Sequence, residues 1–179
     1  MDGFDYSDPD VEWSKRPEID RWILSLLNSL VKDVDGYLEA YEPTRAGRAI
    51  SDFVNDNLSN WYVRLNRRRF WGGGMTEDKL SAYQTLYTCL ETVAKLMAPI
   101  APFYADQLFL DLVAVTGREN VESVHLSDFP VYDESKIDKN LEERMQMAQD
   151  VSSMVLALRR KVNLSLIHIS EPTRPERIS

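Results

Sequence analysis

Cysteine and histidine are scarce in this sequence, and their scarcity excludes several kinds of site. The 179 residues include one cysteine, Cys89, and two histidines, His125 and His168. One cysteine cannot form an internal disulfide, and a cysteine-rich zinc knuckle is excluded. Two distant histidines give poor support for a His/Cys metal site or a cysteine–histidine nucleophile. We therefore expect no metal site, and we interpret Cys89 as a small buried hydrophobic residue in a helix.

Long apolar runs are also missing. No apolar stretch approaches the roughly 18 residues of a membrane-spanning helix. The first residues, MDGFD, are acidic and lack the basic and apolar regions of a signal peptide. Hydrophobic residues make up 44% of the chain, which is enough to build the core of one globular domain. The sequence therefore predicts a cytoplasmic protein without a membrane segment.

Positive charge is limited overall but concentrated in one region. The formal net charge is −8, which argues against a general polyanion-binding protein. Residues 41–71 nevertheless contain six arginines and only three acidic residues, so this window carries +3 and the rest of the chain −11. One basic patch on an acidic protein favours local contact with phosphate groups. The six arginines are Arg45, Arg48, Arg64, Arg67, Arg68 and Arg69.

Apolar residues recur at helical spacing over the first half of the chain. We expect a first helix over residues 17–41, because Pro17 suits the first helical position and acidic residues follow it. A second helix is expected from residue 43 to residue 71, where the triple glycine at 72–74 would end it. The residues expected on the apolar face of this second helix are Ile50, Val54, Leu58, Trp61 and Leu65.

The second half of the chain predicts further helices. Thr76 is a suitable N-cap for a third helix, which Pro99 and Pro102 would end. A shorter helix with Phe103 on its apolar stripe is expected over 103–115, a short extended segment over 121–129, and a last helix over 134–160. Together these elements predict an all-α fold, a helical bundle of four to five helices.

The segment 57–71, NLSNWYVRLNRRRFW, combines amides, aromatic rings and arginines. Single-stranded RNA presents bases that stack on rings and guanidinium planes and that form hydrogen bonds with Asn and Arg. Arginine also pairs with phosphates in a forked geometry. On a regular α-helix Arg68 would project from the end of the bundle. Four polar residues would line one flank of that helix: Asn57, Asn60, Arg64 and Arg67.

Simpler interpretations of these residues remain open. Trp61 stands at helical spacing and suits a protein core better than a platform for bases. The arginine run can also be a solvated cap that complements the helix dipole. The triple glycine is no phosphate loop, because no Lys-Ser/Thr follows it, and Glu142 and Glu143 fit a solvated helix face. The alternative function is therefore a helical scaffold or protein-interaction module without RNA binding.

Seven short runs in the sequence carry a family resemblance. They are DRWIL at 20–24, YEPTRAGRAI at 41–50, LSNWYVR at 58–64, RRRFW at 67–71, YTCL at 87–90, KLMAPIAPF at 95–103 and LRRKVN at 158–163. Together they resemble the anticodon-binding region of isoleucyl-tRNA synthetases, in the bacterial branch that is similar to the eukaryotic enzyme. The Asn-Trp-Tyr run with its spaced arginine is shared more loosely with the valyl, leucyl and methionyl enzymes.

The resemblance implies a class I aminoacyl-tRNA ligase, which joins isoleucine to its tRNA with ATP and Mg²⁺ and edits misloaded valine. The His-Ile-Gly-His and Lys-Met-Ser-Lys-Ser signatures and the editing domain are absent from this chain, so no catalytic residue is carried over. What transfers is the module that docks on the anticodon arm of isoleucine tRNA, beside the parent chain's catalytic and editing domains and without a DNA or membrane partner.

The resemblance also assigns roles to residues of the basic segment. Arg64, Arg67, Arg68 and Arg69 would hold the RNA backbone. Asn57, Asn60 and Trp71 would approach bases.

The resemblance and the composition divide the chain into three parts. Residues 1–16, acidic and irregular, are interpreted as a lead-in from a catalytic body. Residues 17–163 are the expected helical anticodon-binding domain. From Leu164 the run LSLIHISEPTR departs from the family and resembles the translation of a transposon-based sequencing adapter. We therefore expect residues 164–179 to be non-native read-through and the chain to be a fragment without enzymatic activity of its own.

Overall fold

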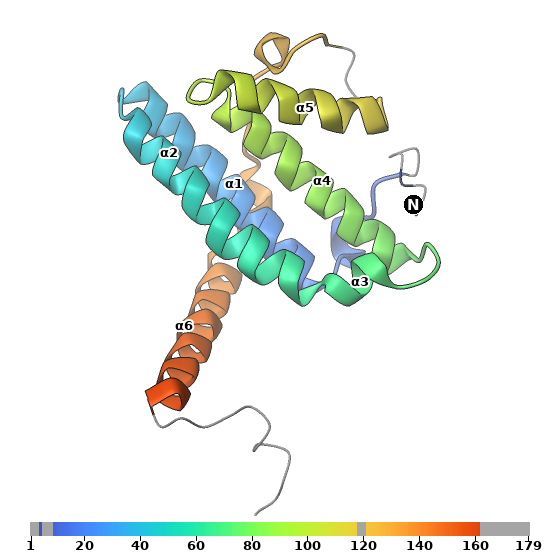
Figure 1. The fold of residues 1–179 in the computed structure, drawn as a ribbon, viewed down its shortest axis with the longest axis vertical. Coiled ribbons are helices and arrows are strands. Elements are labelled where there is room, and N and C mark those ends of the chain that lie inside the picture. Colours follow the sequence, from blue (N-terminus) through green and yellow to red (C-terminus); the bar gives the residue numbers. More distant parts are fainter. Residues whose placement is uncertain (1–3, 5–8, 118–120, 162–179) are drawn as a thin grey trace, which may run out of the picture. The chain divides into compact units, whose positions relative to one another are not determined.

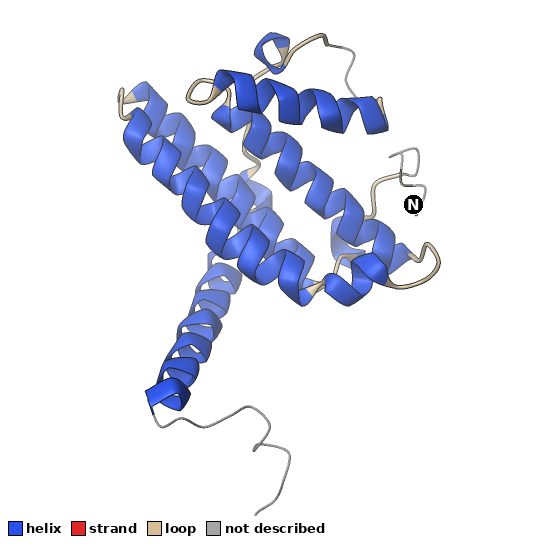
Figure 2. Ribbon diagram, viewed as in Figure 1, coloured by secondary structure: helices blue, strands red, loops and turns tan. Residues whose placement is uncertain are grey.

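The computed structural model describes residues 4, 9–117 and 121–161. Helices make up most of that part of the chain, and no strand occurs in it (Figure 2). The expected all-α fold is therefore confirmed. The chain divides into two units, residues 1–139 and 140–179, and the helical bundle belongs to the first. The expected read-through at 164–179 lies outside the described residues and stays a prediction.

The bundle begins with an antiparallel pair of helices, α1 (Glu18–Glu39) and α2 (Pro43–Asp52) (Figure 1). α1 starts one residue after Pro17, and its apolar face is buried as expected. The helix expected to reach residue 41 ends at Glu39. Tyr41 lies in the following turn with φ of 56°, and its side chain is 92% exposed. The buried apolar residues of α1 are Trp22, Ile23, Leu24, Leu27, Leu30, Val31 and Val34.

The helix expected over 43–71 is not continuous. α2 leads into a π-helical stretch, η2 (Phe53–Val63), and the chain turns at Asn66 before a short helix, α3 (Arg67–Trp71). Asn66 leaves helical geometry at φ −92° and ψ 9°. Its side-chain amide donates to the Tyr62 carbonyl at 2.8 Å, an interaction with the residue four positions earlier that competes with the helical ladder.

The π-helical stretch also changes which residues face the core. Hydrogen bonds from i to i+5 widen the helix, so each residue turns less than the roughly 100° of an α-helix. Leu58 and Tyr62 are therefore buried, and Tyr62 is completely inaccessible. The expectation that Trp61 and Leu65 lie in the core is wrong: Trp61 is half-buried and Leu65 is 56% exposed.

Two further helices complete the bundle, α4 (Glu77–Met97) and α5 (Pro102–Thr116). α5 crosses the end of α4 (Figure 1), after the Pro99–Pro102 region that was expected to end α4. Phe103, expected on an apolar stripe, is 91% exposed at the start of α5, so that expectation is wrong. Phe109 instead anchors α5 in a cluster with Ala94, Ala98, Ala105 and Val124.

Thr76 is the N-cap of α4, as the sequence predicted. Its hydroxyl accepts a hydrogen bond from the backbone N–H of Lys79 at 3.2 Å. Thr76→Ala removes that acceptor, so we expect the free energy of unfolding to fall by about 1 kcal/mol. Urea denaturation of both proteins measures this change. A Thr76→Ser variant keeps the hydroxyl and is expected to retain most of the stability; an equal loss in both variants would contradict the capping role.

The segment between α5 and the last helix contains no strand among its described residues. Residues 124–126 form a 3-10 turn, η3 (Val124–Leu126), so the expected extended segment at 121–129 is wrong. Asp106 of α5 fixes this turn by accepting hydrogen bonds from the Ser123 hydroxyl and the Val124 N–H. These two bonds, led by that of Ser123, lower the pKa of Asp106. Hydrogen bonds to the Asp106 carboxylate therefore hold this segment in a turn, where the sequence had predicted an extended segment.

The expected last helix is divided. Residues 134–136 form a second 3-10 turn, η4 (Glu134–Lys136), and helix α6 (Lys139–Lys161) starts afterwards. α6 has acidic Glu142 in its first turn and Arg159, Arg160 and Lys161 in its last, the polarity that the helix dipole favours. Most of this helix belongs to the second unit.

The lead-in segment is anchored to the bundle instead of being irregular throughout. Residues 13–15 form a 3-10 turn, η1 (Trp13–Lys15), and the next residue, Arg16, is buried. The Arg16 guanidinium donates to the Ser81 carbonyl at 3.3 Å and to the Thr85 hydroxyl at 2.7 Å, both on α4. This lead-in therefore packs along α4 and fixes where α1 begins.

The sequence also led to expectations about Cys89, metal sites and membrane-spanning helices. Cys89 is completely buried in α4, and burial raises the pKa of its thiol. Within the described residues, no cluster of His, Cys, Asp and Glu has the composition of a metal site. None of the described helices is both long and apolar enough to cross a membrane.

Candidate nucleic-acid interface

The predicted basic window 41–71 is divided in the structure: Arg45 and Arg48 lie on α2, where Arg45 pairs with Glu42. The other four arginines follow η2 or lie on α3, at the end of the bundle where α3 joins η2 to α4 (Figure 1). Arg64, Arg67 and Arg68 are exposed there, and none of them forms an ion pair with another described residue. Trp71 is 77% exposed at the C-terminal end of α3. Three guanidinium groups without an ion-pair partner among the described residues and one exposed indole ring therefore share this end of the bundle.

Arg67 and Trp71 form a stacked pair on α3. The guanidinium carbon of Arg67 lies 5.2 Å from the centre of the Trp71 ring, within the range of a cation–π contact. Their four-residue spacing brings the two side chains to the same side of a helix. The pair offers a planar aromatic surface next to a positive charge, which is the combination that an unstacked base and its phosphate require.

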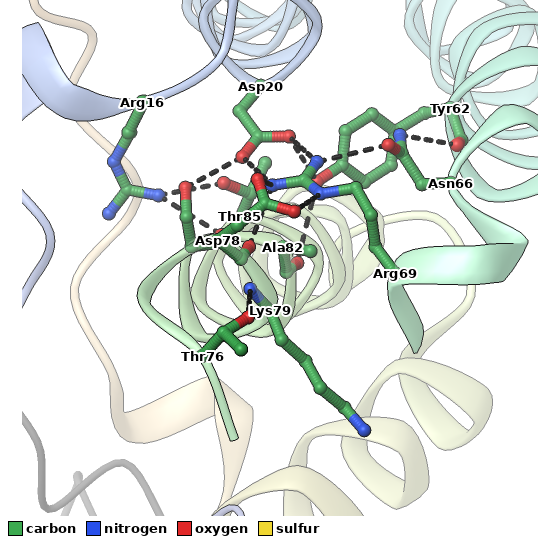
Figure 3. Close-up of polar contacts among 11 residues, drawn as sticks. Arg16, Asp20, Tyr62, Asn66, Arg69, Thr76, Asp78, Lys79, Ala82 and Thr85 are labelled. Carbon is green, nitrogen blue, oxygen red and sulfur yellow. Dashed lines mark hydrogen bonds and ion pairs between the residues drawn. The ribbon is translucent and has the colours of Figure 1, made fainter. Parts of the chain in front are cut away.

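Arg69 takes no part in this exposed set, although the sequence placed it there. All five of its N–H donors are used inside the protein (Figure 3). Nη1 donates to Asp20 Oδ1 at 2.7 Å and to Asn66 Oδ1 at 3.0 Å, and Nη2 donates to Asp20 Oδ2 at 2.9 Å and to the Asp78 carbonyl at 2.8 Å. Nε donates to Asp78 Oδ2 at 2.9 Å. A phosphate contact would require one of these bonds to break.

The carboxylate of Asp20 is the centre of this network. It is completely buried at the start of α1, and each oxygen accepts two hydrogen bonds. Besides the two bonds from Arg69, Oδ1 accepts from the Tyr62 hydroxyl at 2.9 Å and Oδ2 from the Ser81 hydroxyl at 2.7 Å. A buried charge with this many partners avoids the desolvation penalty that an unpaired carboxylate would suffer.

The pKa values of the network reflect burial and pairing. Burial, followed by the negative charge of Asp20, raises the pKa of the Tyr62 hydroxyl, so this group stays a donor. Burial opposes the charged form of Arg69, but the hydrogen bonds that it donates to Asp20 and Asp78 outweigh burial and raise its pKa. The guanidinium of Arg69 therefore keeps its positive charge beside Asp20.

Asn66 and Asp20 are the residues of this region that sequence reasoning missed. Asn66 is buried and bonds at once to the Tyr62 carbonyl and to Arg69, so it holds the turn between η2 and α3. Asp20 was interpreted only as an acid in the first turn of a helix. One sequence signal could have identified Asp20. It is a charged residue placed between apolar residues that repeat at helical spacing, and a charge among core residues requires a partner.

The remaining candidates are placed differently from one another. Asn60 is exposed on η2. Asn57 is half-buried and already has an interaction partner. The predicted straight ridge from Asn57 to Arg67 is interrupted, because η2 changes the angular spacing and Asn66 breaks the helix before Arg67. The structure thus brings Arg67, Arg68 and Trp71 together on α3.

A shallow recess of about 230 Å³ adjoins α3. Its walls include Arg68, the three glycines at 72–74 and Lys79. The Lys79 ammonium donates to the Gly72 carbonyl at 2.6 Å and closes one side. Gly74 has φ of 77°, which only glycine adopts easily, so this turn from α3 into α4 depends on its lack of a side chain.

Comparison with known proteins identifies the region that these residues occupy. A family model described as the anticodon-binding domain of tRNA ligase matches residues 20–169. The chain is 74% identical over 166 residues to an isoleucine–tRNA ligase of Bacteroides fragilis, 72% identical to that of Bacteroides thetaiotaomicron and 67% identical to that of Porphyromonas gingivalis.

Each of these alignments covers 93% of the chain but only 14% of the relative, so the chain spans about one seventh of the length of the curated relatives it matches. The family model, by contrast, covers most of the chain, from the first turn of α1 past the end of α6. The chain therefore belongs to the family of anticodon-binding domains of tRNA ligases.

Proposed function

We propose that this chain is the anticodon-binding part of an isoleucine–tRNA ligase and that the α3 end of its bundle contacts the anticodon stem-loop of isoleucine tRNA. The observation that carries the proposal is the group of exposed, unpaired arginines beside an open tryptophan ring on α3. The family membership and the names of the relatives support tRNA as the RNA concerned.

The chemistry of the exposed group assigns different roles to its members. Arg64, Arg67 and Arg68 would pair with phosphates through forked hydrogen bonds. Trp71 would stack a base of the loop, and Asn60 would bond to a base edge. Asn57 remains a candidate only through atoms that its existing contact leaves available. We assign Arg69 to the interior and no longer to the RNA backbone.

The parent enzyme would supply the chemistry that this chain lacks. In it, catalytic and editing domains outside this chain would use ATP and Mg²⁺ to charge the tRNA, in the cytoplasm. No residue of this chain is assigned a catalytic role. The contribution of the chain would be binding energy at a site remote from the reacting atoms.

A helical scaffold without RNA binding is the second interpretation. It would treat the arginines as a cap that complements the C-terminal end of a helix dipole. α3 has only five residues, so its dipole offers little charge for three arginines to complement. The exposed Trp71 also has no purpose in a cap. Both observations favour RNA binding over the scaffold.

A titration at two salt concentrations tests the proposal. We expect the chain to bind a stem-loop with the anticodon arm of isoleucine tRNA, with an affinity that falls as salt rises, because bound arginines release counterions from phosphates. Arg67→Ala/Arg68→Ala should weaken binding by about tenfold to a hundredfold and lower the salt slope by about one for each arginine. Filter binding at 50 mM and 200 mM salt (about the range over which such slopes are measured) gives both quantities.

The matched control is Lys32→Ala/Lys136→Ala, which removes the same charge from two exposed lysines paired with Glu134 and Asp133. It is expected to leave the affinity almost unchanged. A second RNA with the same stem and a scrambled loop separates recognition of the loop from general attraction. Binding that ignores salt, or an equal loss in both double variants, would favour the scaffold.

A further inference from the structure

Helix α3 is too short to determine its own orientation. Isolated helices shorter than about 12 residues are marginal in water, and α3 has five. Its orientation must therefore come from side chains that anchor it to the rest of the bundle. Two of its residues point inward: Phe70 is buried, and Arg69 is engaged in the network of Asp20 and Asp78.

The two anchors act on different sides of α3. The Phe70 ring meets the rings of Tyr62 and Tyr83 edge-on, with centroids 6.4 Å and 5.6 Å apart. Such apolar contacts locate the helix but restrain its rotation weakly. Arg69 adds directional bonds to two other helices and to the turn before α3, since Asp20 lies on α1, Asp78 on α4 and Asn66 in the turn (Figure 3).

The direction of the exposed side chains follows from these anchors. Arg67, Arg68 and Trp71 flank the inward pair in sequence, so any rotation that moves Arg69 moves them as well. We propose that Arg69, clamped between Asp20 and Asp78, is a positioning residue that orients α3 and thereby presents Arg67, Arg68 and Trp71 to RNA. This inference rests on the function proposed above, and it assigns Asp78 a role in RNA affinity without contact to RNA.

Substitution of Asp78 tests the proposal most sharply, because its charge and its role in orienting α3 predict opposite changes in RNA affinity. Its side chain is about half exposed, so Asp78→Ala leaves the buried pair of Asp20 and Arg69 in place. The change removes a negative charge close to α3, and charges within about 10 Å of a phosphate still repel it at 0.1 M salt. Electrostatics alone therefore predicts tighter RNA binding. The Asp78 carboxylate accepts from Arg69 Nε, and only this side of the clamp is lost, because the bond from Arg69 to the Asp78 backbone carbonyl remains. Loosening of the clamp predicts weaker binding, by about tenfold.

Asp56→Ala is the matched control. Asp56 is exposed on η2 and forms no hydrogen bond or ion pair with another described residue, and its removal changes the net charge equally. This variant is expected to bind the stem-loop as well as the unmodified chain or slightly better. Weaker binding in Asp78→Ala together with unchanged or tighter binding in Asp56→Ala supports positioning. Equal or tighter binding in Asp78→Ala overturns it.

Fluorine NMR of the full chain labelled with 5-fluorotryptophan gives a readout that needs no RNA. The chain has four tryptophans, of which Trp22 lies in the core and Trp71 on α3. In Asp78→Ala the Trp71 signal should move or broaden, while the Trp22 signal should stay in place. An unmoved Trp71 signal, or a Trp22 signal that moves with it, overturns the positioning role.

The two measurements also separate this inference from the proposed function. If the unmodified chain does not bind the stem-loop, the proposed function fails, while the Trp71 signal still decides whether Asp78 orients α3. If the chain binds and Asp78→Ala binds equally well, positioning fails and the proposed function stands.

Discussion

Asp20→Ala is expected to lower the free energy of unfolding of the bundle by about 3–5 kcal/mol, the largest stability effect that we predict for one residue. Asp20 is completely buried and accepts four hydrogen bonds. Its removal takes away the Ser81 hydroxyl's acceptor and the nearer of two acceptors of the Tyr62 hydroxyl. Arg69 loses two of its five hydrogen bonds and keeps those to Asn66 and Asp78. Breaking a buried ion pair costs more than the pair contributes, because the remaining charge stays buried.

Urea denaturation followed by circular dichroism measures this loss. Asp20→Asn is the informative companion, since the amide keeps the shape but supplies one acceptor oxygen and no charge. We expect its stability to lie between those of the other two proteins. Asp52→Ala, which removes an exposed carboxylate from α2, should change stability by less than about 0.5 kcal/mol. A loss below about 1 kcal/mol in Asp20→Ala would show that the network does not hold the bundle together.

Trp71→Ala is expected to weaken binding of the anticodon stem-loop by between about fivefold and about a hundredfold. Stacking of one base on an aromatic ring contributes about 1–3 kcal/mol, and Trp71 is the open ring beside the free arginines. Because the ring is 77% exposed, its removal should leave the free energy of unfolding nearly unchanged. Binding and stability are therefore expected to separate, in contrast to Asp20→Ala.

Two further variants show whether a loss of affinity in Trp71→Ala comes from base stacking. Trp71→Phe keeps an aromatic surface and should recover much of the affinity, although the smaller ring stacks less. Phe103→Ala removes an even more exposed ring at the other end of α4, which spans about 30 Å. This variant should bind as the unmodified chain does. If Trp71→Ala retains full affinity, the base-stacking role of Trp71 is wrong and the arginines alone account for binding.

Local sequence signals determined the helices and most of their ends. The N-cap at Thr76, the prolines at 99 and 102 and the apolar face of α1 act within a few residues of themselves, so they can be interpreted without the fold. These signals predict the all-α architecture. The motifs of residues 57–71 predict RNA contacts in the part of the chain that includes α3. The family membership is consistent with both conclusions.

The prediction for residues 43–71 failed where the helical phase changes, along the π-helical stretch η2 and at the turn at Asn66. A regular α-helix through 43–71 placed Trp61 and Leu65 in the core, whereas η2 turns Tyr62 inward. Neither the wider helix nor the turn at Asn66 has a signature among neighbouring residues. Asn66 serves both as a partner of Tyr62 and as a partner of Arg69, and only the packed bundle brings those groups together.

The sequence by itself determined that arginines and aromatic rings gather between residues 57 and 71, because composition and order are fixed by the chain. The tertiary structure decided which of them remain available. Arg67, Arg68 and Arg69 are adjacent and chemically identical, yet only Arg69 meets Asp20, which lies 49 residues away in the sequence. A buried carboxylate must be neutralised by the nearest cation that the packing allows, so one arginine is held inside and its neighbours stay free.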